Sequence, residues 1–437
     1  MVSYILSIVY HKTVRRRIFF LGRYSCVKVK RCAILVQSKK NRGNLLGVYG
    51  MAKNKKKKSN KPTTIRYFDY SLLAVMVFLI CFGLVMLYST SAYEAQSKFN
   101  DGMYYLKRQG IISMGGLVIM LFVTRIDYHR YAKYSAALYG FAMLLMALVK
   151  YSPLGYEVYG ARRWLQIPGT GQTMQPAEVT KIAVILFIPY LICKMGSKVH
   201  KLKGSLMVLA WGAVAAFGVF YLTDNLSSAI IVMGIACFIL FVVHKKMRPF
   251  VIIGGCGVGA FVAIAAVLGK VLENSDNFRL RRIIAWLNPE KYASSLSFQT
   301  LQGMYAIGSG GFFGKGLGNS AQKMIIPEVQ NDFILTVICE ELGVFGAIMV
   351  FVLFGLLLYR LLFIAQNAPD LYGALIVTGI FSHIAIQVIL NVAVVVNLIP
   401  NTGITLPFIS YGGTSVLFLM IEMGIALGVS RKIKIEE

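Results

Sequence analysis

The sequence predicts an all-α polytopic membrane protein with ten transmembrane helices. Of its 437 residues, 57% are hydrophobic and only 15% are charged, whereas about a quarter of the residues in ordinary soluble domains are charged. A bilayer core about 30 Å thick needs roughly 20 helical residues to cross it, and apolar runs of about that length recur along the chain. Because these runs do not alternate polar and apolar residues, they indicate helices rather than barrel strands.

The apolar runs are counted as spans in chain order. They cover approximately residues 70–89, 109–124, 135–151, 177–195, 205–222, 226–243, 249–269, 333–359, 372–396 and 413–430. Most connections are short, but about 60 residues separate the seventh span from the eighth. Long ordered connections are often functional, so this large loop is the first place to look for chemistry.

Basic residues in the short loops predict the orientation of the helices. They follow the second, fourth, sixth and tenth spans, at Arg125, Arg130, Lys133, 194–203, Lys245, Lys246, Arg248 and 431–434. Short loops rich in lysine and arginine stay in the cytoplasm. Both termini are therefore predicted to be cytoplasmic, and the loop between the seventh and eighth spans extracytoplasmic.

The amino-terminal segment, residues 1–66, is strongly basic. It holds 18 Lys and Arg residues and no acid, while the rest of the chain carries 28 basic and 18 acidic residues, a net of +10. Membrane lipids account for this charge, and no nucleic-acid partner is needed. The lysine run after Met51 suggests that translation starts there and that residues 1–50 are an upstream extension; the alternative is a basic arm on anionic headgroups. The helical domain is predicted over 67–431, with a cytoplasmic tail at 432–437.

Histidine and cysteine chemistry is not expected on the outer face. Four of the five histidines fall on the cytoplasmic side, and His383 shares a face of its span with Gln387 and Asn391. The seven cysteines form no CxxC pair, so no disulfide framework or zinc site is predicted. Carboxylates must therefore carry any proton transfer outside the membrane.

A glycine-rich segment at 308–316 contains Gly314-Lys315 but is not a nucleotide-binding loop. The residue five positions before Gly314 is Ser309, and Gly316 follows the lysine where Ser or Thr is required. Two interpretations stay open: a plain turn, or an anion site in which close backbone approach is joined by the charge of Lys315.

Four motifs together resemble one known family. They are 327–333 leading into 340–343, 306–318, 160–164 with Glu178 and Lys181, and 406–415. These runs resemble the shape, elongation, division and sporulation family, the FtsW and RodA proteins, with departures at 223–228 and Thr405. The resemblance implies a ten-helix glycosyltransferase that polymerises lipid II into peptidoglycan strands outside the bacterial cytoplasmic membrane. It also implies a separate class B penicillin-binding transpeptidase and other division or elongation proteins as partners.

The resemblance implies that Asp332, which lies in the first of these motifs, is the catalytic residue, and the chemistry of the reaction is consistent with this. Displacing a polyprenyl diphosphate requires a base for the attacking hydroxyl but little acid help. Asp332 stands at the outer end of the eighth span, where a lipid-linked sugar would present its reacting atoms, and inversion at the donor carbon is expected. The alternative is a helix N-cap.

The predicted substrate-binding residues are mainly cations on outer loops. Arg162, Arg163, Lys315 and Lys323 are expected to offset the charge of the diphosphate; their alternative is snorkelling to headgroups. Glu178 and Lys181, three apart, are expected to form an ion pair that also walls the substrate cavity. Trp164 and Ser410 complete the set. A divalent cation, Mg²⁺ or Mn²⁺, fits the same electrostatics, although no cluster of ligands requires one.

The preferred role is in cell division, because Asn331 replaces the threonine more usual before the aspartate. The alternatives are a transporter that flips lipid II and a noncatalytic scaffold of the division machinery. A groove between spans, open sideways to the bilayer, is the expected substrate entrance. Glycines at 254, 255, 257 and 259 on the seventh span allow close approach of helices.

Overall fold

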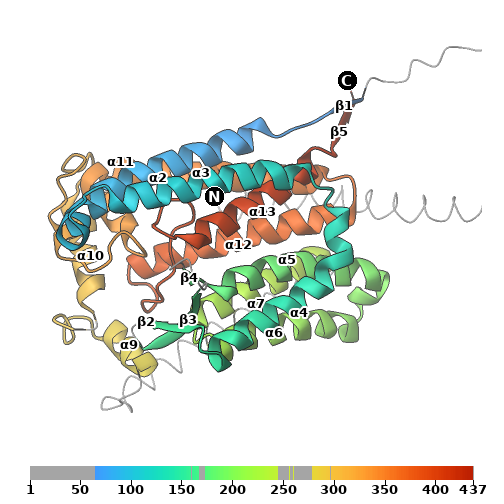
Figure 1. Cartoon of the computed structure of the whole chain (residues 1–437), viewed down its shortest axis with the longest axis horizontal. Helices are drawn as coiled ribbons and strands as arrows, with labels where there is room; N and C mark the ends of the chain where they lie inside the picture. The colour runs from blue at the N-terminus through green and yellow to red at the C-terminus, as the bar shows by residue number, and fades with distance from the viewer. Residues whose placement is uncertain are drawn as a thin grey trace, which may run out of the picture. The chain divides into compact units, whose positions relative to one another are not determined.

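The computed structural model describes residues 64–158, 160–166, 173–244, 278–295 and 297–436, together with positions 255 and 259. They belong to one compact unit, Pro62–Glu437. Its helices are α2 (Tyr70–Phe99), α3 (Tyr104–Arg125), α4 (His129–Tyr151), α5 (Pro176–Met195), η1 (Gly196–His200), α6 (Leu202–Leu222), α7 (Leu226–Val243), α9 (Phe278–Leu287), α10 (Phe298–Ser309), η2 (Gln322–Met324), α11 (Ile334–Asn367), α12 (Leu371–Val395) and α13 (Thr414–Ser430) (Figure 1).

The long helices agree with the predicted spans. Within the described ranges, eight helices are long and apolar enough to cross a membrane, and α13, with 17 residues, coincides with the predicted tenth span. The predicted seventh span, 249–269, lies outside the described residues apart from 255 and 259. The chain is a mostly helical, multi-pass membrane protein, and the total of ten spans stays a prediction.

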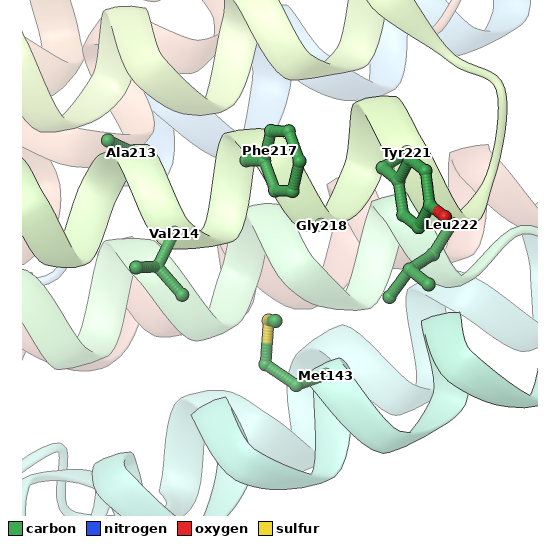
Figure 2. A pocket seen from close by; sticks show the side chains of 7 residues that line it. All are labelled: Met143, Ala213, Val214, Phe217, Gly218, Tyr221 and Leu222. Atoms are coloured by element: carbon green, nitrogen blue, oxygen red, sulfur yellow. The ribbon is translucent and has the colours of Figure 1, made fainter.

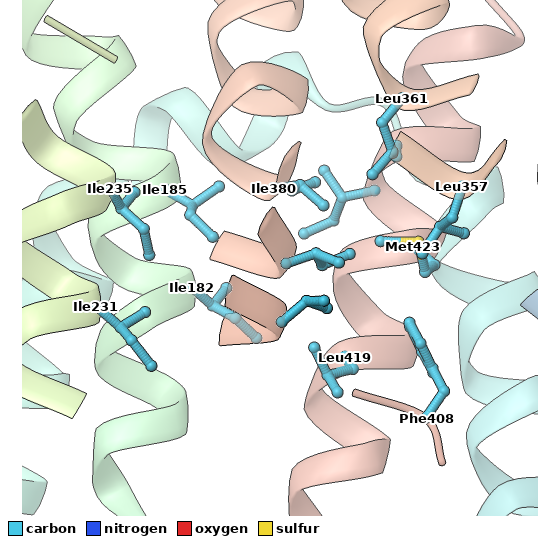
Figure 3. Close-up of a cluster of buried hydrophobic side chains, with 14 of the residues drawn as sticks. Ile182, Ile185, Ile231, Ile235, Leu357, Leu361, Ile380, Phe408, Leu419 and Met423 are labelled. Carbon is cyan, nitrogen blue, oxygen red and sulfur yellow. The ribbon is translucent and has the colours of Figure 1, made fainter. Parts of the chain in front are cut away.

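The centre of the bundle is formed where α5, α7 and α12 meet. Figure 3 shows Ile185 of α5 and Ile235 of α7 near Ile380 of α12, and all three side chains are fully buried. A Cβ on Gly379 would lie 3.3 Å from Ile185, so α12 packs closely on α5. Because lipid tails are as apolar as isoleucine, close packing rather than transfer out of water holds these helices together.

One end of the bundle brings together the first and last described strands and several charged loop residues. Arg360 pairs with Asp69 at 2.8 Å, and Lys432 pairs with Asp127 at 2.8 Å. Strands β1 (Thr64–Arg66) and β5 (Lys434–Glu436) pair antiparallel. The segment after α3 and the segment after α13, which the sequence predicts to share one side, therefore meet at one end of the bundle, while the basic residues at 245–248 lie outside the described residues. We call the opposite end, which carries Asp332, the site end.

The all-α prediction omits a small sheet at the site end. Strands β2 (Gly155–Val158), β3 (Ala161–Gln166) and β4 (Thr173–Met174) form it in the order β2-β3-β4. The guanidinium of Arg162 donates to the carbonyl oxygens of Lys150 at 3.1 Å and Ser152 at 2.9 Å. Arg162 thereby connects the β2-β3 hairpin to the end of α4. No local sequence pattern predicts this tertiary contact.

Candidate active site

Asp332 lies in the loop immediately before α11, on a backbone fixed by α12. The side-chain amide of Asn391 donates to the Asp332 carbonyl at 2.8 Å and to the Ile404 carbonyl at 2.7 Å. The helix starts at Ile334 and its N-cap is Phe333. The alternative interpretation of Asp332 as an N-cap is therefore wrong, and its carboxylate is not used to start α11.

Two further segments hold the loop that carries Asp332. Gln330 donates from Nε2 to Glu94 of α2 at 2.9 Å, and its carbonyl accepts from the Tyr411 amide at 2.9 Å. Gly403 faces the carboxylate so closely that an added Cβ would lie 3.9 Å from Asp332 Oδ2. Residues far apart in the sequence thus build the wall around Asp332.

Arg282 of α9 is a site residue that the sequence analysis missed. Its Nη1 donates to the Asn401 carbonyl at 3.2 Å, and Trp286 of the same helix donates to the Asn397 carbonyl at 3.0 Å. These two hydrogen bonds attach α9 to the loop before α13. The Arg282 guanidinium thereby lies close enough to Asp332 to interact with it electrostatically. The available signal was the arginine-rich stretch 279–282 in the large outer loop, but spacing alone did not connect it to Asp332.

The Asp332 carboxyl is poised to exchange a proton near neutral pH. Burial raises the pKa of Asp332 to about 6, and the nearby Glu328 carboxylate raises it further, while the Arg282 guanidinium opposes both effects. A base is most effective when its pKa lies near the working pH. The geometry and the charges suit Asp332 to accepting a proton from a hydroxyl.

Arg162, Arg163 and Trp164 lie on strand β3 at the site end, apart from the loop that carries Asp332. Arg162 is engaged by carbonyl oxygens of α4 and of the turn that follows it. Trp164 pairs with Tyr156 across the strands and is half-buried, as is Arg163. The substrate-binding role of these three residues stays a prediction.

Glu178 and Lys181 form the expected ion pair in the first turns of α5. Lys181 Nζ lies 2.8 Å from Glu178 Oε1, and the two side chains are 2% and 8% exposed. A pair buried to this extent satisfies both charges internally. Its predicted second role, as a wall of the substrate cavity, stays a prediction.

Lys315, Lys323 and Ser410 all have partners within the fold. Lys315 pairs with Glu340 at 2.6 Å and Lys323 pairs with Glu341 at 3.1 Å. Ser410 Oγ accepts from the Leu406 amide at 2.8 Å and closes a buried turn. The positive charges of the two lysines are thus compensated within the protein, and their contact with a diphosphate stays a prediction.

The glycine-rich segment is joined to α11 by backbone hydrogen bonds. The amides of Lys315 and Gly316 donate to the carbonyls of Glu340 and Glu341, each at 2.9 Å. A Cβ on Gly314 would lie 2.1 Å from the Glu341 carbonyl oxygen, so only glycine permits this approach. Those amides are occupied by the helix, which favours the turn interpretation over the anion site.

An apolar hollow lies on the flank of the bundle between α4 and α6 (Figure 2). It measures about 490 Å³ and is lined by Met143, Ala213, Val214, Phe217, Gly218, Tyr221 and Leu222. This lining has no charged group, so the hollow suits a hydrocarbon chain and not the reacting sugars. A lateral substrate entrance stays a prediction.

The residues around Asp332 fit a divalent cation only together with a substrate. In the described part of the chain, no three histidine, cysteine, aspartate or glutamate side chains gather as a metal site. Asp332 and Glu328 lie close enough to interact electrostatically. Mg²⁺ commonly binds one or two carboxylates together with substrate phosphates, so a diphosphate would have to supply the remaining oxygens.

Comparison with known proteins gives consistent matches over most of the chain. A family model described as cell cycle protein, covering FtsW, RodA and SpoVE, matches residues 70–435. A probable peptidoglycan glycosyltransferase FtsW of Trichlorobacter lovleyi is 36% identical over 86% of this chain and 96% of its own length. Stage V sporulation protein E of Bacillus subtilis is 36% identical over 83% of this chain and 97% of its own.

Solved structures share the fold. A peptidoglycan synthase complex, described as coordinating polymerization and crosslinking, contains a chain that is 25% identical, with a TM-score of 0.67 over 83% of this chain and 98% of that one. The rod shape determining protein RodA of Thermus thermophilus is 24% identical, with a TM-score of 0.60 over 84% of this chain and 97% of that one.

Proposed function

Because the chain belongs to the FtsW, RodA and SpoVE family of cell cycle proteins, we propose that it polymerises lipid II into peptidoglycan glycan strands. It is a glycosyltransferase of peptidoglycan synthesis, in keeping with its curated relatives. The observation that carries the proposal is Asp332, held at the site end with its pKa raised to about 6 beside Arg282. The basic loops at the opposite end support our proposal that the site end lies on the outer face of the bacterial cytoplasmic membrane.

In the proposed reaction, the Asp332 carboxylate takes the proton of the acceptor sugar's hydroxyl. The hydroxyl oxygen then forms a bond to the anomeric carbon of the donor, with inversion. The bond from that carbon to the diphosphate oxygen breaks, and undecaprenyl diphosphate leaves with the electron pair. Arg282 is positioned to offset charge near the base, and the diphosphate requires little acid help once its charge is neutralised.

The proposed partners follow from the same assignment. A class B penicillin-binding protein would supply crosslinking, since the solved relative is described within a complex that polymerises and crosslinks. The other proposed partners are further division or elongation proteins and membrane lipids. Division is the proposed branch because several relatives carry the name FtsW. A Mg²⁺ or Mn²⁺ ion arriving with the diphosphate is the proposed cofactor.

The purified full-length protein should convert lipid II in detergent into glycan polymer, measured by gel analysis of labelled product. In a second assay, the same protein is placed in vesicles and the translocation of lipid II across their membrane is measured. Translocation of lipid II without any polymer would favour the flippase alternative. Neither polymer nor translocation would favour the scaffold.

The rate of polymerisation should rise with pH through about pH 6, because only the ionised Asp332 can accept a proton. Glu328→Gln should move this limb to lower pH, since the neighbouring negative charge raises the Asp332 pKa. Arg282→Gln should move it to higher pH, since the cation lowers that pKa. The measurement is kcat/KM for lipid II from about pH 5 to pH 8. Shifts in the same direction for both variants would contradict the electrostatic assignment.

A further inference from the structure

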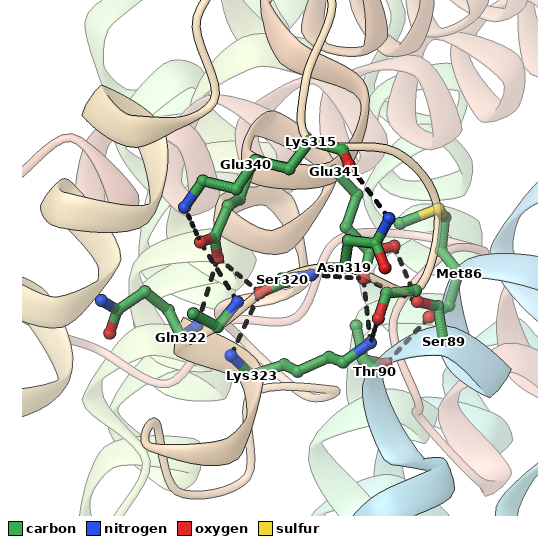
Figure 4. Close-up of polar contacts among 12 residues, drawn as sticks. Met86, Ser89, Thr90, Lys315, Asn319, Ser320, Gln322, Lys323, Glu340 and Glu341 are labelled. Atoms are coloured by element: carbon green, nitrogen blue, oxygen red, sulfur yellow. Dashed lines mark hydrogen bonds and ion pairs between the residues drawn. The ribbon is translucent and has the colours of Figure 1, made fainter.

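Two ion pairs that end on buried glutamates join the loop after α10 to the first turns of α11 (Figure 4). Glu340 accepts from Lys315 Nζ at 2.6 Å, and Glu341 accepts from Lys323 Nζ at 3.1 Å. Both glutamate side chains are fully buried. We call these four residues the clamp. Loss of either lysine would leave a buried, unpaired carboxylate.

Other donors complete the shell around each carboxylate. Ser320 Oγ donates to Glu340, and the Gln322 amide lies 3.3 Å from the same carboxylate. Ser89 of α2 lies 2.7 and 2.6 Å from the two oxygens of Glu341. The clamp therefore connects three parts of the fold: the loop 310–324, α11 and α2.

The clamp acts on a short helical segment that is separated from the rest of α11. Gly343 has φ 68° and ψ −162°, which breaks the helix after residues 334–342. Beyond the break, the Val344 amide donates to the Gly311 carbonyl in the loop at 3.0 Å, and the Phe345 amide donates to the Phe312 carbonyl at 3.2 Å. Because α11 is interrupted at Gly343, the rest of the helix does not fix the orientation of segment 334–342. Contacts from the loop must therefore fix it.

Asp332 directly precedes this segment. Glu340 lies six positions after the first residue of the segment, Ile334, about 9 Å along the helix axis at 1.5 Å per residue. Asn391 holds the Asp332 backbone at the other end of the segment. We infer that the clamp residues are positioning residues: they set the angle of the segment 334–342 and thereby aim the Asp332 carboxylate at the acceptor hydroxyl. The inference rests on the proposed function.

Direct binding of the diphosphate is the competing role for the same lysines. Lys323 is 8% exposed, and its Nζ also donates to the Gly318 carbonyl at 2.6 Å. Lys315 Nζ donates to Ser309 Oγ at 2.9 Å. The clamp is electrically neutral, and although Lys315 is 37% exposed, the ammonium groups of both lysines donate to acceptors within the protein. These contacts favour positioning over ligand binding.

The decisive comparison is Lys323→Met against Lys323→Met/Glu341→Gln in the purified full-length protein. The single change should lower kcat for lipid II polymerisation by about tenfold or more, with KM changed by less than about twofold, because misplacement of the base by about 1 Å is costly. The double change removes the unpaired charge but also lacks the ion pair, so kcat should stay within about threefold of the single variant, because the contact that holds the segment is absent in both. The matched control is Lys107→Met/Asp101→Asn, an exposed pair at 2.8 Å, which should leave both constants unchanged.

A binding measurement separates the two roles without turnover. In an Asp332→Asn background, Lys323→Met should bind lipid II with a Kd within about twofold of the parent, since positioning acts on the base and not on affinity. A large increase in Kd, or a double variant with the wild-type kcat, would overturn the inference. If Lys323→Met does not fold, Glu341→Gln and the double variant carry the same comparison. Absence of polymer from the wild-type protein would instead overturn the proposed function, and the inference with it.

Discussion

Asp332→Asn is expected to reduce the rate of lipid II polymerisation by about 10³-fold, within the range for removal of a general base. The amide is nearly the same size as the carboxylate but cannot take the proton of the attacking hydroxyl. The measurement is the initial rate of polymer formation by purified protein at saturating lipid II. Retention of the wild-type rate would remove Asp332 from the mechanism.

The same substitution should not destabilise the protein. Burial raises the pKa of Asp332 to about 6, so above that pH the ionised carboxyl opposes folding and its neutral replacement relieves the cost. The melting temperature near pH 7 should therefore be equal to or above that of wild type. Asp101→Asn, at an exposed position, is the control and should keep its activity. A lower melting temperature for Asp332→Asn would mean that the lost activity reflects damage to the fold.

Gly343→Ala is expected to cost about 3 kcal/mol or more of stability and to slow polymerisation. Gly343 has φ 68° and ψ −162°, a conformation that is essentially restricted to glycine. An added Cβ would also lie 2.3 Å from the Phe312 carbonyl oxygen. The substitution should displace the loop that holds segment 334–342, and with it Asp332. Thermal unfolding in detergent and the polymerisation rate are the two measurements.

Gly355→Ala provides the control within the same helix. A Cβ at Gly355 would meet nothing within 4 Å, and alanine favours helix over glycine by up to about 1 kcal/mol. This variant should be as stable as wild type or more so, with unchanged activity. Equal melting temperatures for Gly343→Ala and Gly355→Ala would contradict the role of the break in α11.

The membrane helices were predictable because each is encoded by its own local run of apolar residues. The predicted span 226–243 coincides with α7, and the predicted start at 177 falls one residue after the start of α5. The ends of α11 were less accurate, since its helix continues to Asn367 rather than stopping at 359. The hairpin β2-β3 was missed because Arg162 stabilises it through carbonyls of α4.

The candidate site was only partly predictable. Asp332 was predicted from the motif that carries the family resemblance, because several carboxylates lie near the outer face and their positions in the sequence alone do not choose among them. Arg282 was not, because its place beside Asp332 depends on a bond to Asn401, more than a hundred residues further along the chain. Lys315 and Lys323 appeared to be free cations, since nothing in their spacing shows that each lies against a glutamate of α11.

The sequence by itself determined the position and approximate length of most of the described membrane helices, and it predicted the grouping of the basic loops and the identity of the central carboxylate. These properties depend on residue type and on short-range periodicity, which any segment carries with it. Only the tertiary structure decided which cation faces Asp332, which lysines are paired and where α11 breaks. Those outcomes arise when distant backbone and side-chain groups must satisfy one another's hydrogen bonds and charges in a site with little water.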